Sequence, residues 1–143
     1  MDTAYKTTLE LDKVLARAVQ LCACQETKEM MQALEPAPTV EDERYDLAQT
    51  NAINALLIKN GSPRFGSVRE VRRIVAHARK GGILSMGELL EIAATLRNFS
   101  GLSQWYGLSE HEMLPTDDLF FALAPQPVLE KQIAESILSP EEM

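Results

Sequence analysis

The chain has 143 residues, a formal net charge of −7 and an apolar fraction of 45%, which fit one folded domain rather than a disordered tail. Its low isoelectric point, about 4.8, opposes broad, non-specific binding to nucleic acid or to an anionic membrane. Only 6% of the residues are aromatic, and Ala and Leu dominate the apolar set. This composition favours an all-α protein over a β-sandwich.

The chain shows no sign of export or of membrane insertion. It has no run of about 18 apolar residues, and its first residues lack the basic cap and apolar core of a signal peptide. Cys22 and Cys24, the only cysteines, stand too close together for good disulfide geometry. We therefore expect reduced thiols and a cytoplasmic location.

Apolar residues recur at helical spacing over the first sixty residues and predict three helices. Their expected spans are about 9–22, 24–34 and 40–59. Pro36 ends the second helix, and Thr39 with Asp42 caps the third, which Gly61 ends. The inward face of the third helix is expected to comprise Val40, Leu47, Ala48, Ala52, Ala55 and Leu56.

Two capping boxes, Ser67 with Glu70 and Ser85 with Glu88, predict the starts of the next two helices. In each box a hydroxyl and a carboxylate satisfy two otherwise unpaired backbone N–H groups. The expected spans are about 68–80, ended by Gly81-Gly82, and about 86–106, ended by Gly107.

The last part of the chain predicts a loop over about 109–116 and two short helices. Thr116 caps the first, and Pro127 opens the second as a first-turn proline. Their expected spans are about 117–124 and 127–138. The whole chain then forms an irregular bundle of about six to seven helices, organised as a single domain over 1–143. Several of these helices carry apolar residues on more than one side, which is typical of helices that pack against additional protein.

The sequence contains no pattern that predicts catalysis or a metal site. His77 and His111, the only histidines, do not stand at ligand spacing from a second histidine, and Gly81-Gly82 is explained as a helix end. Cys22 and Cys24 lack the two-residue spacing of a redox or zinc motif and are interpreted as small residues at a helix end. We therefore expect no enzymatic activity and no metal site in this chain.

Basic residues concentrate between residues 64 and 80, here called the basic segment, which has a local balance of +5. On a helix, its apolar residues fall on one side and its basic residues on the other. The residues expected to make contacts are Arg69, Arg72, Arg73, Arg79 and Lys80. They can meet the chain's own acids or solvent, a protein surface, or the phosphates of a nucleic acid, and no interleaved aromatic residue favours the last.

An ordered set of short motifs gives the chain a family resemblance. The motifs are TLELDKVL at 8–15, KE at 28–29, LEP at 34–36, VRRI at 71–74, RKGGILS at 79–85, ELL at 88–90, Ile92 and TLR at 95–97. Together they resemble the N-terminal region of the type-two branch of the bacterial MutS family, over nearly the whole chain. Family chains continue past the point where this sequence ends, so the resemblance implies a piece of a longer protein.

The resemblance implies a helical region that feeds the levers of a dimeric MutS-like ATPase. It implies ATP and magnesium for the full-length protein, commonly a nuclease domain, and branched DNA or the ribosome as the target, with suppression of recombination as one outcome. No ATPase or nuclease motif falls within these residues, so the chain itself is expected to be a non-catalytic scaffold or interaction domain. The alternative is a stand-alone helical adaptor that binds proteins, favoured by the acidic, motif-free composition.

Overall fold

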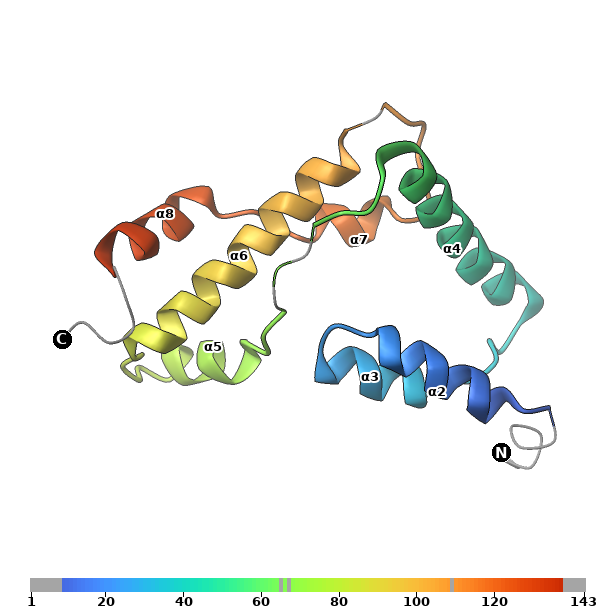
Figure 1. Ribbon diagram of the computed structural model, residues 1–143, viewed down its shortest axis with the longest axis horizontal. Coiled ribbons are helices and arrows are strands. Elements are labelled where there is room, and N and C mark those ends of the chain that lie inside the picture. Colours follow the sequence, from blue (N-terminus) through green and yellow to red (C-terminus); the bar gives the residue numbers. More distant parts are fainter. Residues whose placement is uncertain (1–8, 65, 67, 109, 138–143) are drawn as a thin grey trace. The chain divides into compact units, whose positions relative to one another are not determined.

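The computed structural model describes residues 9–64, 66, 68–108 and 110–137, and its helices are shown in Figure 1. These residues form seven helices and no strand, which confirms the all-α prediction and the expected number of helices. Contacts within the chain divide it into two compact units, residues 1–36 and 37–143. That the chain is one domain of a longer protein stays a prediction.

The first unit contains α2 (Leu11–Leu21) and α3 (Gln25–Gln32), which contact each other. Leu15 is the buried residue of α2. Cys22 follows the end of α2 and Cys24 occupies the N-cap position of α3 without a side-chain bond, so both thiols stand at the turn between the helices. Both are half-buried and free, which agrees with the expected reduced state.

The second unit opens with α4 (Val40–Asn60), whose start the sequence predicted correctly. The Thr39 hydroxyl accepts a hydrogen bond from the Asp42 N–H at 3.1 Å. The predicted inward face was wrong, however. Leu56 is buried and Ala52 partly so, but Val40, Leu47, Ala48 and Ala55 are exposed. The inward face runs instead through the partly buried side chains beside Leu56 in the second half of the helix, namely Gln49, Ala52, Ile53, Leu57 and Asn60.

Helix α6 (Met86–Tyr106) packs against the two helices that follow it in the chain. The predicted capping box is present: the Glu88 N–H donates to the Ser85 hydroxyl at 3.3 Å, and the Ser85 N–H donates to the Glu88 carboxylate at 2.8 Å. Helix α8 (Pro127–Ser136) packs along α6, as Figure 1 shows, and opens with a proline as predicted. The core between α6 and α8 contains the buried residues Ala93, Ile133 and Ile137.

Helix α5 (Arg72–Arg79) starts four residues later than predicted. Ser67 of the predicted capping box lies outside the described residues, and Val71 occupies the N-cap position without a side-chain bond. The cause is a tertiary contact: the Gly66 N–H donates to the Asn98 side-chain oxygen on α6 at 2.9 Å. This bond anchors the segment to α6, so residues 68–71 remain non-helical and the helix begins after them.

The predicted end of α5 is confirmed. Gly81 has a φ of 81°, and the Gly82 N–H donates to the His77 carbonyl at 3.1 Å. The Gly81 N–H donates to the Ala78 carbonyl at 2.9 Å. This pair of bonds is a Schellman motif, which requires a left-handed residue at Gly81.

The connection from α6 to α8 contains α7 (Asp117–Phe121), which is shorter than predicted. Described residues 110–116 before it form no helix, where the loop was expected. Thr116 stands at the N-cap of α7, but its side chain makes no capping bond. The Thr116 hydroxyl is instead 2.8 Å from the hydroxyl of Tyr106, because both side chains are buried together.

The capping box at Ser85 yields a direct test. Ser85→Ala removes the acceptor of the Glu88 N–H and a bond to the Glu88 carboxylate, so the free energy of unfolding should fall by about 1 kcal/mol in urea denaturation. Ser62→Ala, at an exposed non-helical position, is the control and should change it by less than about 0.5 kcal/mol. Equal effects of the two substitutions would contradict the role of the cap.

Candidate contact surfaces

The structure separates the basic segment into helical and non-helical parts. Arg72, Arg73 and Arg79 lie on α5 and Lys80 follows as its C-cap, whereas Arg69 precedes the helix. The predicted arrangement of all these residues on one helix is therefore wrong for Arg69, because the bond of Gly66 to α6 delays the helix. Ile74 is the buried residue of α5, on the predicted inward side.

All five basic side chains that the sequence singled out are exposed. Among the described residues, Arg69, Arg73, Arg79 and Lys80 form no salt bridge. Their charges are therefore not neutralised by direct pairing within this part of the chain. An exposed set of unpaired cations can meet phosphate or carboxylate groups of another molecule.

One flank of the basic segment borders an acidic groove between α5 and α6, with a volume of about 480 Å³. Arg73 and His77 line it from α5, and Glu88 and Glu91 line it from α6. Hydrogen bonds from the Ser85 backbone and hydroxyl hold the pKa of Glu88 below its usual value, so this carboxylate is negative at neutral pH. A polyanion would therefore be repelled on the α6 side and favoured toward Arg79 and Lys80.

A second cluster, which the sequence did not predict, surrounds Tyr106 at the end of α6. The Tyr106 hydroxyl donates to the Asp117 carboxylate at 2.7 Å and lies 2.8 Å from the Thr116 hydroxyl. Asp117 also accepts a bond from the Leu114 N–H at 3.1 Å, and His111 Nε2 lies 3.5 Å from its carboxylate. These bonds join the loop before α7 to α6, so the cluster braces the fold.

The titration of this cluster follows from its contacts. The hydrogen bond from Tyr106, aided by those from Leu114 and His111, lowers the pKa of Asp117 against the opposing effect of burial. Burial raises the pKa of the Tyr106 phenol. Tyr106 is therefore a neutral donor and Asp117 a charged acceptor near neutral pH. No local pattern in the sequence marks this pairing, since the residues meet only after the loop folds back.

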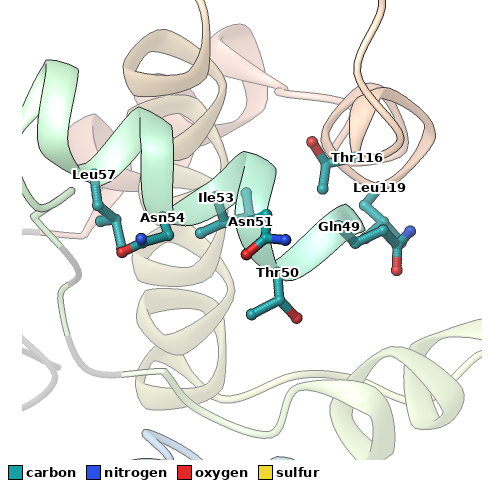
Figure 2. A pocket seen from close by; sticks show the side chains of 8 residues that line it. All are labelled: Gln49, Thr50, Asn51, Ile53, Asn54, Leu57, Thr116 and Leu119. Atoms are coloured by element: carbon teal, nitrogen blue, oxygen red, sulfur yellow. The ribbon is translucent and has the colours of Figure 1, made fainter. Parts of the chain in front are cut away.

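A shallow groove of about 540 Å³ runs between α4 and α7. Figure 2 shows Thr50, Asn51 and Asn54 along one side of α4, with Thr116 and Leu119 contributed by the start of α7. None of its lining side chains is ionisable. This groove suits uncharged hydrogen-bonding and apolar groups rather than phosphate.

In the described part of the chain, His77 and the two cysteines do not belong to a candidate metal-binding group. Among the described residues, no group of three or more His, Cys, Asp or Glu side chains is placed to hold a metal ion. The Cys24 sulfur lies 3.0 Å from the Thr27 hydroxyl, and the Cys22 thiol donates to the Ala18 carbonyl at 3.4 Å. No helix in the described part of the chain is long and apolar enough to cross a membrane.

The described residues thus define an all-α protein whose surface offers exposed cations, one acidic and one uncharged groove, and uncovered apolar side chains. Comparison with curated proteins then relates the chain to bacterial MutS2. It is 27% identical over 137 residues to Endonuclease MutS2 of Clostridium beijerinckii, covering 94% of this chain and 17% of that protein. It is 29% identical over 145 residues to Endonuclease MutS2 of Ruminiclostridium cellulolyticum, covering 100% of this chain and 18% of that protein.

A third relative, Endonuclease MutS2 of Clostridium perfringens strain SM101, is 30% identical over 112 residues, or 78% of this chain and 14% of that protein. The chain is therefore a MutS2-related region, as the ordered motifs predicted. It spans less than a fifth of the length of these relatives. No family model matches the sequence, and no solved structure matches it.

Removal of the Tyr106 hydroxyl tests the brace. Tyr106→Phe should lower the free energy of unfolding by about 1–2 kcal/mol, because it removes a buried hydrogen bond with Thr116 and a half-buried one with Asp117. Tyr45→Phe is the matched control: its hydroxyl donates to the Pro115 carbonyl at an exposed site, so its loss should cost less than about 0.5 kcal/mol. Urea denaturation of both variants measures the difference, and a larger cost for Tyr45→Phe would contradict the assignment.

Acid titration provides an independent test of Asp117. Since folding lowers its pKa, Asp117 stabilises the fold above its unfolded-state pKa, and this contribution is lost as the pH falls through the lower, folded-state pKa. The stability of Asp117→Asn should therefore decline less steeply than that of the wild type below about pH 4. Asp118→Asn, at an exposed carboxylate, controls for the removal of one negative charge. Equal acid slopes in Asp117→Asn and the wild type would contradict the prediction.

Proposed function

We propose that this chain is a non-catalytic helical scaffold and interaction domain of a MutS2-like protein that acts on DNA or on ribosomes and suppresses recombination. The observation that carries the proposal is the number of large apolar side chains left uncovered on its helices. Ile58 is 80% exposed, Phe121 74% and Val128 70%. Large apolar side chains left exposed on several helices are typical of helices that pack against additional protein.

The relationship to MutS2 supports the same role. The relatives are named endonucleases, and the chain spans less than a fifth of their length. In this proposal ATP, magnesium and endonuclease activity belong to other parts of a longer, cytoplasmic and homodimeric protein. The lack of a phosphate-binding loop in this sequence supports the placement of ATP in another part of the protein.

The basic segment is the proposed contact with nucleic acid or with a neighbouring MutS-like domain. Arg69, Arg79 and Lys80 are exposed cations without a salt bridge in the described part of the chain. A phosphate backbone fits such a surface without base-specific contacts. An acidic protein surface fits it by the same charge complementarity, so the experiment below separates the two.

Binding of a fluorescent four-way DNA junction at low salt tests the nucleic-acid contact. Arg79→Glu combined with Lys80→Glu should weaken binding by roughly tenfold or more and reduce the dependence of log K on log salt by about 1 for each lost phosphate contact. Arg17→Glu with Lys131→Glu makes the same change in net charge elsewhere and is the control. Absent binding, or equal losses in both variants, would contradict a nucleic-acid contact of the basic segment.

A further inference from the structure

The polar side chains that line the groove between α4 and α7 are of two kinds. Three of them already bond within the chain: Gln49 donates to a loop carbonyl at 3.0 Å, Thr50 donates to a carbonyl one turn earlier on α4 at 3.0 Å, and Thr116 bonds at the end of α6. Asn51 and Asn54 are exposed, and their carboxamides have no hydrogen-bond partner in the described part of the chain. These two carboxamides are therefore free to bind another molecule.

The apolar part of the groove has a fixed floor and an exposed wall. Ile53 and Leu57 are partly buried, because they pack against the buried cluster that contains Trp105. Leu119 contributes the wall on α7, with 58% of its surface exposed (Figure 2). Since the core holds the floor in place, a ligand would meet a surface that is already formed, which lowers the cost of binding.

The two free carboxamides match the hydrogen-bonding groups of an extended peptide. A carboxamide donates and accepts, so it complements both the C=O and the N–H of a peptide backbone. A helix uses these groups internally, whereas an extended segment leaves them free. Asn51 and Asn54 stand three residues apart, which separates their Cβ atoms by about 5–6 Å, close to the repeat of about 6.6 Å along one edge of an extended chain.

The length of the groove sets the length of the segment that it can hold. From Gln49 to Leu57, α4 rises by roughly 12 Å, which is the span of about four extended residues. Successive side chains of such a segment point to opposite sides. One apolar side chain can therefore enter between Ile53 and Leu119 while its neighbours point toward solvent.

The charge next to the groove favours a basic residue at one end of the segment. Asp46 lies one turn before Thr50 on α4, and it is exposed without a salt bridge in the part of the chain that the structure describes. The first turn of α4 adds three more acids, Glu41, Asp42 and Glu43. These acids attract a cationic side chain and repel a phosphate backbone. No aromatic side chain lines the groove to stack a nucleic-acid base.

We propose that the groove between α4 and α7 binds an extended segment of a partner protein, about four residues long, with an apolar side chain at its centre and a basic residue near Asp46. The site names a partner for the interaction role proposed above and rests on that role. It does not include the basic segment, so the DNA experiment and the peptide experiments below can fail independently.

The first test measures fluorescence anisotropy of labelled, acetylated hexapeptide amides from a positional library, titrated with the 143-residue chain. The tightest pools should carry Leu or Ile at the centre and Lys or Arg at one end. Asn51→Ala with Asn54→Ala should weaken binding of the best peptide by roughly tenfold or more, because both carboxamides lose their backbone bonds. Gln104→Ala with Gln132→Ala removes two exposed amides from α6 and α8 and is the matched control.

The outcomes of this test are distinct. Circular dichroism should be unchanged in both double variants, since alanine favours the helix at exposed positions. The proposal would be overturned if no pool bound more tightly than about 1 mM, or if the two double variants lost affinity equally. It would also be overturned if an unlabelled single-stranded oligonucleotide displaced the peptide, because the groove would then bind a nucleic acid.

The second test examines the backbone contact and the basic end. N-methylation of each amide of the best peptide in turn should weaken binding to the wild type by roughly tenfold at one position or more, and by less than about twofold in Asn51→Ala with Asn54→Ala. Asp46→Lys should shift the preference at the basic end to Asp or Glu, whereas Glu135→Lys, an exposed control on α8, should leave it unchanged. Equal effects of methylation on the wild type and the double variant, or an unchanged preference in Asp46→Lys, would contradict the proposed arrangement.

Discussion

The second unit of this chain depends on how the end of α6 is anchored. Tyr106 places a hydroxyl between Thr116 and Asp117 and a ring against Phe120, with ring centroids 3.8 Å apart and planes 9° apart. Trp105, its neighbour, packs with Leu56 of α4 in the same buried cluster. One turn of helix therefore joins α4, the loop before α7 and α7 itself. Two further bonds tie the end of α4 to the same turn: the Asn60 side chain donates to the Trp105 carbonyl, and the Trp105 indole donates to the Gly61 carbonyl.

Much of the helical layout could be predicted from local signals. Thr39, Ser85 with Glu88, and Pro127 mark helix starts through bonds or backbone geometry that depend only on nearby residues. Gly81 marks a helix end for the same reason. The start of α5 could not be predicted in this way, because it depends on the bond between Gly66 and Asn98, which lies 32 residues farther along the chain.

The surfaces were less predictable than the helices. Apolar residues lie on several sides of α4, so periodicity alone could not decide which side would be buried, and Leu47 was assigned to the wrong one. The cluster of Tyr106, Thr116 and Asp117 was missed because it joins residues across a loop. The basic residues were found correctly as exposed groups, since a row of arginines cannot be buried without partners. The partner of these basic residues could not be predicted, because phosphate and carboxylate groups complement the same charges.

The environment of Trp105 has a practical consequence. This is the only tryptophan in the chain, it is 7% exposed, and its indole N–H donates to the Gly61 carbonyl at 2.7 Å. Its fluorescence therefore reports the opening of the second unit alone, whereas circular dichroism sums the helices of both. Melting curves that coincide by the two probes would mean that residues 1–36 unfold together with the rest. Curves that separate would mean that the α2–α3 hairpin unfolds in a transition of its own. The single tryptophan thus allows a direct test of whether the two units unfold cooperatively.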